Sequence, residues 1–269
     1  MGATEDAASR RPARPGGSRL ILRRVLKRVA IRVPLERAEE ARAEWLERFP
    51  EGFEERACGL DLELAAYTED EPPPGAVVED VEPGWEDRWR EFHRAVRVGP
   101  LWIGPPWQLP PRDAVPVVID PGRAFGTGAH ATSQLCLELV SELELASLLD
   151  VGCGSGVIAI AAALLGFSPV IAVDVDPAAV DATLRNASAN GFTLDVRRLD
   201  LTTDELPDAE VAVANISAAL VETVLAQTRA RVVVASGFLE RDEPELGKYL
   251  RRERRVRGGW AADLLERSE

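Results

Sequence analysis

The chain is poor in the residues that build disulfide frameworks and zinc sites. Its 269 residues include only three cysteines and two histidines. Cys58, Cys136 and Cys153 lie far apart, are odd in number and form no C-x-x-C pair. A disulfide framework is therefore excluded, and no metal site is expected.

The chain also lacks a long hydrophobic run. No apolar stretch approaches the roughly 20 residues that a membrane-spanning helix needs, and the N-terminus has no apolar signal segment. Hydrophobic residues still make up 46% of the chain, which is enough for a sizeable core. We therefore expect a cytoplasmic protein without membrane contact.

Charge is spread unevenly along the chain. The net charge is −13, yet residues 1–34 carry nine basic and two acidic residues, which leaves −20 on the remainder. An acidic body argues against stable nucleic-acid binding and fits a basic partner, although acidic side chains also simply keep a protein soluble. Residues 1–19 show no apolar periodicity, so we expect a disordered basic tail there rather than an RNA-binding arm.

The most informative stretch is 148–161. A short apolar strand runs into a loop with glycines at alternate positions (Gly152, Gly154 and Gly156), and a helix of small residues follows. An unbroken apolar strand is typical of a central parallel strand. Alternate glycines let the backbone turn tightly and let a ligand approach it, with the loop N–H groups facing that ligand.

Two carboxylates accompany this loop. Asp150 stands directly before it, and Asp174 ends the next strand, about twenty residues further on, where an acid can accept both hydroxyls of an adenosine ribose. A dinucleotide fingerprint would place its third glycine at Val157, but this loop has G-x-G-x-G spacing instead. The spacing favours S-adenosylmethionine over a nicotinamide cofactor.

Strands and helices then alternate to the end of the chain. We expect strands at 194–199, 211–214 and 232–235, helices at 177–190 and 218–228, and a closing antiparallel hairpin over 254–265. This order predicts an α/β fold with a doubly wound, mostly parallel, Rossmann-like sheet. Ligands bind at the carboxyl ends of such strands, where Asp174, Asp200 and Asn215 all fall.

The N-terminal part reads as a separate small unit. A strand at 25–33, an amphipathic helix at 36–49 and two short strands within 53–67 predict an α+β domain over residues 20–70. A linker with consecutive prolines and a Trp-rich helix is expected over 71–115, and a catalytic domain over 116–269.

The run 120–133 precedes the catalytic core. It concentrates three glycines and several hydrogen-bonding side chains in a short loop, more than a turn needs. We expect this loop to cover the cofactor and the incoming substrate. The hydroxyl of Thr132 or Ser133 is expected to cap a helix over 134–145.

These motifs together resemble a known family. The motifs D-P-G-R-A-F-G-T-G-A-H-A-T-S (120–133), D-V-G-C-G-S-G (150–156), V-D-V-D-P (173–177) and V-A-N-I (213–216) are similar to those of the PrmA family, the bacterial ribosomal protein L11 methyltransferases. The resemblance implies a class I methyltransferase domain, a small substrate-recognition domain and S-adenosylmethionine as cofactor. It also implies methylation of lysine and N-terminal amines on a basic ribosomal protein.

The resemblance and the spacing together suggest specific roles. The family's cofactor contacts fall on Ser133, where the family usually has threonine, and on Gly152, Asp174 and Asn215. Another difference is Ala131, where the family usually has proline. The full expected cofactor site comprises Thr132, Ser133, Asp150, Gly152, Gly154, Gly156, Asp174, Asp200 and Asn215.

Three residues are candidates for catalysis. The Asn215 side-chain oxygen would accept a hydrogen bond from the substrate amine and orient its lone pair. Phe125 would form an apolar wall for an alkylammonium group. His130 would orient the loop or relay a proton.

Other functions share these motifs. A related eukaryotic branch methylates lysines of an electron-transfer flavoprotein subunit and carries a similar glycine-histidine loop. An RNA or small-molecule methyltransferase, and a non-catalytic adenosine-binding module, are further alternatives. Intact acids and an intact loop argue against the last of these.

Overall fold

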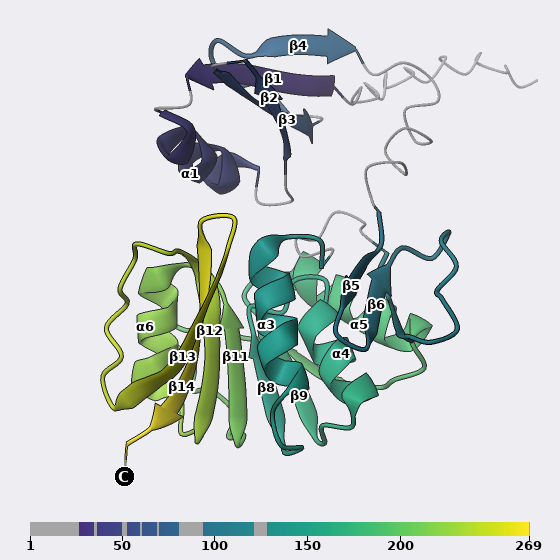
Figure 1. The fold of residues 1–269 in the computed structure, drawn as a ribbon, viewed down its shortest axis with the longest axis vertical. Helices are drawn as coiled ribbons and strands as arrows, with labels where there is room; N and C mark the ends of the chain where they lie inside the picture. Colours follow the sequence, from purple (N-terminus) through teal and green to yellow (C-terminus); the bar gives the residue numbers. More distant parts are fainter. Residues whose placement is uncertain are drawn as a thin grey trace, which may run out of the picture.

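The computed structural model describes residues 27–34, 37–49, 53–59, 61–68, 70–80, 94–120 and 128–268. Figure 1 shows a small N-terminal unit (residues 27–80) and a larger C-terminal unit (residues 94–268). The expected basic tail and the expected Trp-rich helix at 85–92 lie outside the described residues.

The N-terminal unit is a four-stranded antiparallel sheet with one helix. Its elements are β1 (Lys27–Pro34), α1 (Ala38–Arg48), β2 (Glu54–Cys58), β3 (Asp61–Thr68) and β4 (Val77–Asp80), in the sheet order β2-β3-β1-β4. Trp45 of α1 packs into one core with Val29 and Leu64. Strand β4 pairs with β1 although the sequence analysis placed it in the linker, so the sheet continues through Asp80.

The opposite face of this sheet is built around a buried carboxylate. Glu63 of β3 accepts hydrogen bonds from Arg32 (2.8 Å), Arg28 (3.0 Å) and Arg56 (2.7 Å), which come from β1 and β2. The hydrogen bond from Arg32 and then that from Arg28 lower the pKa of Glu63 to about 2. The charged carboxylate therefore ties three strands together.

The C-terminal unit holds two sheets and four helices among its described residues. A small sheet of β5 (Val96–Val98), β6 (Leu101–Gly104) and β7 (Val115–Val118) precedes the large one. The elements that follow are α3 (Ala131–Ser141), β8 (Leu148–Val151), α4 (Val157–Leu165), β9 (Val170–Asp174), α5 (Pro177–Ala189), β10 (Asp195–Arg198), β11 (Val211–Asn215), α6 (Ala218–Gln227), β12 (Val232–Leu239), β13 (Tyr249–Arg257) and β14 (Trp260–Arg267).

The large sheet has the strand order β10-β9-β8-β11-β12-β14-β13. The first five strands are parallel, and β14 lies antiparallel to both β12 and β13. The predicted doubly wound sheet and its closing hairpin are therefore confirmed. The order reverses at β8, whose carboxyl end leads into the glycine loop (residues 152–156), and ligands of such sheets bind at this reversal point.

Burial explains why these segments form strands and helices. All four residues of β8 are buried, because β8 lies in the middle of the sheet with helices on both faces. Helices α3, α4 and α5 contribute to the core on one face, and α6 contributes to the core on the other. No helix within the described part of the chain is long and apolar enough to cross a membrane.

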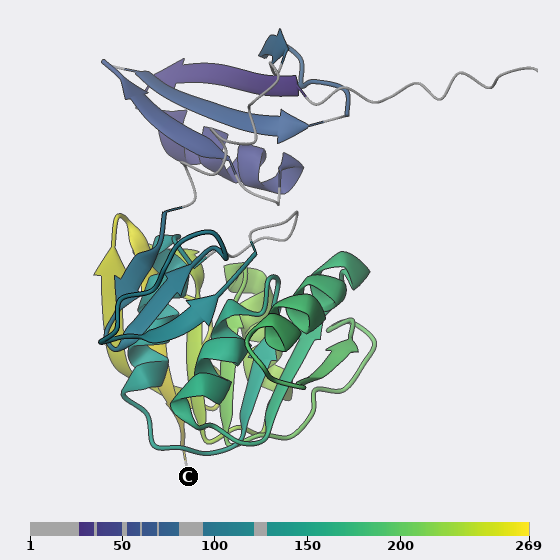
Figure 2. The ribbon, with the colours of Figure 1, turned by 90° about the vertical axis from the view of Figure 1, so that its right-hand side faces the viewer.

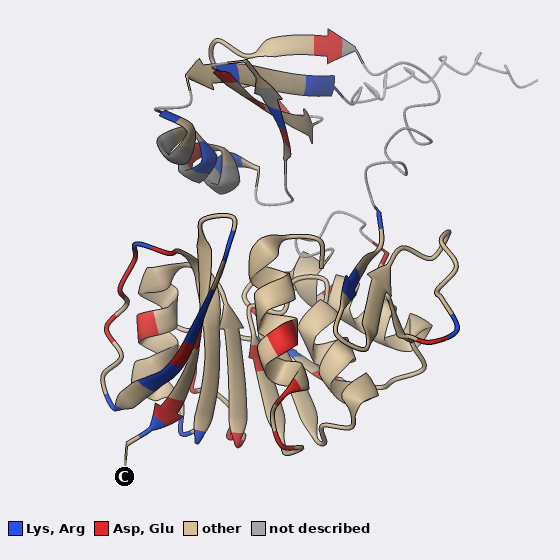
Figure 3. Cartoon of the chain, viewed as in Figure 1, with Lys and Arg blue, Asp and Glu red and all other residues tan. Residues whose placement is uncertain are grey.

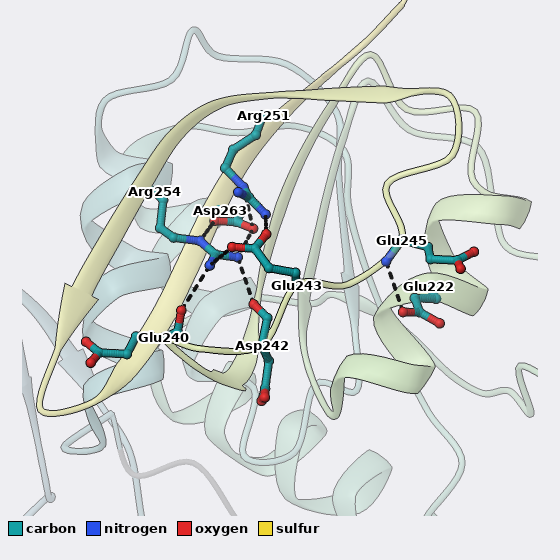
Figure 4. Close-up of polar contacts among 8 residues, drawn as sticks. All are labelled: Glu222, Glu240, Asp242, Glu243, Glu245, Arg251, Arg254 and Asp263. Carbon is teal, nitrogen blue, oxygen red and sulfur yellow. Dashed lines mark hydrogen bonds and ion pairs between the residues drawn. The ribbon is translucent and has the colours of Figure 1, made fainter.

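The segment between β12 and β13 covers the end of the sheet beside α6. Figure 3 shows acidic residues on this segment and basic residues along β13. In Figure 4, Arg251 and Arg254 converge on Asp263 of β14, whose side chain is fully buried. The Arg254 guanidinium donates to both Asp263 oxygens (2.7 and 2.9 Å), to Glu243, and to the carbonyls of residues 240 and 242.

Asp263→Asn is expected to lower the free energy of unfolding by roughly 2 kcal/mol, because Asp263 accepts three charge-assisted hydrogen bonds from Arg251 and Arg254, and the amide nitrogen of asparagine cannot accept at least one of them. Urea unfolding of both proteins measures the difference. Asp208→Asn is the matched control, because Asp208 pairs with Arg229 at 3.6 Å on the surface. Surface pairs contribute about 0–1 kcal/mol. Equal losses for the two variants would contradict a stabilising role for Asp263.

The two units face each other across the carboxyl edge of the large sheet. Figures 1 and 2 show the N-terminal unit on the side of the sheet at which β8, β9 and β11 end. The glycine loop and the start of α3 lie at this same edge. The fold thus places the expected site between the large sheet and the N-terminal unit.

Candidate active site

Four neighbouring strands bring the expected site residues to one edge. The glycine loop follows β8, Asp174 ends β9, Asp200 lies just beyond β10, and Asn215 ends β11. The parallel register of these strands places their carboxyl ends side by side. The structure therefore brings together residues that are dispersed over 66 positions of the sequence, from 150 to 215.

The glycines of this loop are required by its backbone. Gly152, Gly154 and Gly156 have φ values of 75°, 54° and 84°, a region that residues with a Cβ rarely adopt. A Cβ on Gly152 would lie 2.4 Å from Ile216, and one on Gly156 would lie 2.8 Å from Thr183. The loop is therefore packed tightly between β11 and α5.

Most N–H groups of the loop are already donated within the protein. Gly152 and Cys153 donate to the carbonyl of Val173 (2.9 and 3.1 Å), Gly154 donates to Asp174 (3.0 Å), and Gly156 donates to Cys153 (2.8 Å). That the loop N–H groups surround the ligand stays a prediction. A phosphate ligand needs free N–H donors. A cationic ligand instead needs acceptors, and the loop carbonyls can provide them, because a carbonyl that accepts one hydrogen bond can accept a second.

Asp174 connects the loop to the start of α5. Its Oδ2 accepts from the Gly154 N–H and its Oδ1 from the Asp176 N–H, both at 3.0 Å. Each carboxylate oxygen has a second lone pair for a ligand hydroxyl. Asp176 in turn caps α5 by accepting from the Ala178 N–H at 2.8 Å, as the sequence predicts.

Asp150 supports the loop from behind. Its side chain is buried, and its Oδ2 accepts from the Ala159 N–H in the first turn of α4 at 3.1 Å. Burial and, to a smaller extent, the nearby charge of Asp174 raise the pKa of Asp150 to about 7, although the hydrogen bond from the Ala159 N–H opposes this shift. Asp150 thus braces the loop from its buried side, and the carboxylate of Asp174 is the negative group that faces the ligand side.

The raised pKa of Asp150 has a measurable effect on stability. Between pH 4 and pH 7 the native state binds a proton at Asp150 more tightly than the unfolded state, whose ordinary pKa is 3.8. Asp150 therefore destabilises the fold progressively as pH rises through this window. We expect the free energy of unfolding of the wild type, minus that of Asp150→Asn, to fall from pH 4 to pH 7. Parallel pH profiles in urea unfolding would contradict the raised pKa.

His130 caps α3, which corrects the predicted caps Thr132 and Ser133. Its ring accepts from the Thr132 N–H at 3.4 Å and lies 2.8 Å from the Thr132 hydroxyl. The helix begins at residue 131 and ends at residue 141. The expected helix covered 134–145, so it begins three residues and ends four residues earlier than expected. The cap shifts because a half-buried imidazole at this position reaches the free N–H of the first turn.

His130 also contacts an aromatic residue that the sequence analysis left without a site role. The His130 and Trp260 ring centroids lie 4.9 Å apart, edge to face. Burial lowers the pKa of His130, which keeps the ring neutral at neutral pH. Trp260 begins β14, so only the hairpin topology brings it to the site, and no local pattern marks it.

Ser133 and Asn215 meet between α3 and β11. The Asn215 Nδ2 donates to the Ser133 hydroxyl at 3.3 Å, and Ser133 is buried. The following residue, Ile216, donates to the Ser236 carbonyl at 3.0 Å, and Gly237 (φ 98°) would place a Cβ 2.1 Å from the Ile216 carbonyl oxygen. The Asn215 amide is thereby held with its nitrogen inward, which leaves its oxygen as the acceptor.

Asp200 and Val175 lie beside Asp174. Asp200 accepts from the N–H and the hydroxyl of Thr202 (2.9 and 2.7 Å), and these hydrogen bonds lower its pKa. This is the geometry of a strand-end turn. Val175 is 54% exposed at the same edge, although a valine usually buries most of its surface. Sequence reasoning missed this apolar surface, which suits a flat aromatic base.

Phe125 lies outside the described residues, so its expected role stays a prediction. Among the residues that the structure does describe, no three His, Cys, Asp or Glu side chains are grouped as a metal site requires.

Comparison with known proteins identifies one family. The family model of the ribosomal protein L11 methyltransferases (PrmA) matches residues 55–254 of this chain. A ribosomal protein L11 methyltransferase of Symbiobacterium thermophilum is 41% identical over 163 residues, which are 59% of this chain and 54% of the relative. One of Aeromonas hydrophila is 42% identical over 184 residues, 64% of this chain and 63% of the relative.

A solved structure agrees with these relatives. The ribosomal protein L11 methylase of Lactobacillus delbrueckii subsp. bulgaricus superposes with a TM-score of 0.59 at 25% identity, covering 66% of this chain and all of that one. The chain spans between about half and two thirds of the length of the curated relatives named above. The resemblance seen in the motifs is thus confirmed.

Proposed function

Because the chain belongs to the PrmA family of ribosomal protein L11 methyltransferases, we propose that it transfers methyl groups from S-adenosylmethionine to amino groups of a ribosomal protein. The observation that carries this proposal is the edge where the glycine loop, Asp174 and the Asn215–Ser133 pair meet. Two of its relatives are named ribosomal protein L11 methyltransferase, which supports a ribosomal protein as the methyl acceptor.

The charges of the edge fit this cofactor. When bound, S-adenosylmethionine supplies a methyl group activated by a positively charged sulfur. Asp174 places a negative charge beside a loop whose N–H groups are largely occupied, an arrangement that favours a cation over a diphosphate. Asp174 would hold the ribose, and Val175 would cover one face of the base.

Asn215 would orient the substrate amine. Its side-chain oxygen accepts a hydrogen bond from the amine N–H while Ser133 holds its nitrogen, so the amine lone pair is directed away from Asn215. Correct alignment of two reacting groups contributes several kcal/mol to such a displacement, and no metal or enzyme nucleophile is required. Thr132 and Ser133 would support this side of the cofactor site.

The site must also favour a neutral amine, because a protonated lysine has no lone pair. Aromatic and apolar surroundings disfavour the ammonium form by desolvation. The neutral His130 ring beside Trp260 adds no positive charge there, and its contacts with Thr132 identify it as an element that orients the start of α3. These contacts support loop orientation over proton relay for His130.

The N-terminal unit would recognise the protein substrate. Helix α1 covers the face of its sheet that is turned toward the large sheet (Figure 2), and the exposed side chains of Arg32 and Arg56 lie on the other face, around Glu63. This unit lies on the side of the large sheet where the site is (Figure 2). A substrate protein bound on the α1 side of this unit, the side turned toward the large sheet (Figure 2), would have its amines near Asn215.

Transfer of a labelled methyl group tests the proposed function. The whole chain is incubated with labelled S-adenosylmethionine and, separately, with bacterial ribosomal protein L11, ribosomal RNA and an electron-transfer flavoprotein subunit. We expect label on the ribosomal protein. Label on the flavoprotein or on RNA alone would replace the proposed substrate, and binding of cofactor without any transfer would favour a non-catalytic adenosine-binding module.

A further inference from the structure

Helix α5 presents three polar side chains along one face. Thr183, Asn186 and Asn190 are separated by three and four residues, so they share a helix face. Thr183 and Asn186 are buried, at 0% and 3% exposure. Buried polar side chains must find partners, and each of these three has partners outside its own helix, while the Asn190 Nδ2 also donates to the Asn186 carbonyl of α5 at 2.8 Å.

Asn186 bridges two segments that meet at the site. Its Nδ2 donates to the carbonyl of Ser155 in the glycine loop at 2.9 Å. Its Oδ1 accepts from the N–H of Asp120, two residues beyond the end of β7, at 3.1 Å. One amide thus connects the cofactor side with the segment that leads towards His130.

The neighbours of Asn186 each hold only one of these segments. The Thr183 hydroxyl donates to the Gly154 carbonyl at 3.0 Å and contacts the Cys153 sulfur, both in the glycine loop. The Asn190 side chain forms a pair of hydrogen bonds with the N–H and the carbonyl of Val118 in β7, at 2.9 and 2.7 Å. The Asn190 amide therefore pairs with the backbone of β7 as a neighbouring strand would. Its described hydrogen bonds do not include the glycine loop.

Gly128 is the first described residue after Asp120 and is packed against the core. A Cβ on Gly128 would lie 2.6 Å from Ile103 and 3.3 Å from Val157, the first residue of α4. Two residues later His130 caps α3 and leads to Ser133, which holds Asn215. Asp120 precedes His130 by only ten positions in the sequence, so the end of β7 and the residues that would orient the amine belong to neighbouring parts of the chain.

We propose that Asn186 is a positioning residue that ties the glycine loop to the end of β7, so that cofactor binding and methyl transfer depend on the same amide. The proposal rests on the proposed function. A purely structural amide would contribute to fold stability alone. A coupling amide contributes to both cofactor affinity and turnover, in contrast to its two neighbours.

Three variants separate these roles. Asn186→Asp keeps an oxygen that accepts from the Asp120 N–H. It has no N–H to donate to the Ser155 carbonyl, so a carboxylate oxygen would face that carbonyl oxygen. Thr183→Val removes the contacts with the glycine loop, and Asn190→Asp removes the donor to the Val118 carbonyl of β7 together with the donor to the Asn186 carbonyl of α5. Calorimetry with S-adenosylhomocysteine measures affinity, labelled transfer at saturating cofactor measures kcat, and thermal unfolding monitors the fold.

We expect Asn186→Asp to weaken S-adenosylhomocysteine binding and to lower kcat by about tenfold each, the size of effect that loss of a buried hydrogen bond produces. Thr183→Val is expected to weaken cofactor binding with a much smaller effect on kcat. Asn190→Asp is expected to lower kcat with cofactor affinity as in the wild type. Asn186→Ala, which removes both hydrogen bonds without adding charge, is expected to repeat the double loss if the aspartate variant does not fold.

Two outcomes would overturn the inference. If the Asn186 variants change only cofactor affinity, as expected for Thr183→Val, or only kcat, as expected for Asn190→Asp, then Asn186 positions only the glycine loop or only β7. If they lower only the unfolding midpoint, its role is structural. A wild-type chain that binds no S-adenosylhomocysteine and transfers no methyl group would instead overturn the proposed function itself.

Discussion

Asp174→Ala is expected to weaken binding of S-adenosylhomocysteine by at least about a hundredfold, which corresponds to roughly 2.7 kcal/mol. Two losses combine in this variant. The proposed acceptor of the ribose hydroxyls disappears, and the Gly154 N–H loses the carboxylate that holds the glycine loop. A hydrogen bond to a charged group contributes about 1.5–3 kcal/mol, so either loss alone would be measurable by calorimetry.

The matched control for Asp174 lies two residues away. Asp176→Asn keeps an N-cap oxygen for the Ala178 N–H, because asparagine caps helices as well as aspartate does. It also removes one negative charge from the same edge. Near-normal affinity in Asp176→Asn and lost affinity in Asp174→Ala would assign the effect to the Asp174 carboxylate. Unchanged affinity in Asp174→Ala would remove Asp174 from the cofactor site.

Asn215→Ala is expected to lower kcat by about a hundredfold to a thousandfold while cofactor affinity changes little. The expected size follows from other active sites, where loss of one preorganised polar group reduces kcat by about 10²–10³. The acceptor for the substrate amine is lost, whereas the glycine loop and Asp174 keep their hydrogen bonds. Labelled transfer at saturating substrate measures kcat, and calorimetry measures cofactor affinity.

Ser133→Ala provides the graded comparison for Asn215. It removes the hydroxyl that accepts from the Asn215 Nδ2 at 3.3 Å but leaves the Asn215 oxygen in place. A smaller loss of kcat than in Asn215→Ala is expected, because the amide is less well oriented but still present. Parallel losses of affinity and kcat in Asn215→Ala would instead restrict Asn215 to cofactor binding.

The sequence predicts the large sheet and its loop because their signals are local. An unbroken apolar strand, alternate glycines and a following helix are all contained in residues 148–161. The Asp176–Pro177 start of α5 is equally local, since a capping side chain acts on the next turn of its own helix. The carboxyl-edge rule then places Asp174 and Asn215 together without knowledge of any side-chain contact.

The supporting contacts are not predictable in this way, because they join segments far apart in the chain. Asn186 looks like any polar residue of an amphipathic helix until β7 and the glycine loop are placed on either side of it. Trp260 reaches His130 only through the antiparallel hairpin at the end of the sheet. The cap of α3 was assigned to Thr132 and Ser133 because hydroxyl residues are the usual caps, and the imidazole that takes this role is seldom one.

The most direct test is a crystal structure of the whole chain with S-adenosylhomocysteine. We predict the ribose hydroxyls on the Asp174 carboxylate, the base against Val175, and the sulfur facing the Asn215 side-chain oxygen across the glycine loop. Ligand bound away from the carboxyl ends of β8, β9 and β11, or with its sulfur remote from Asn215, would contradict the proposed site.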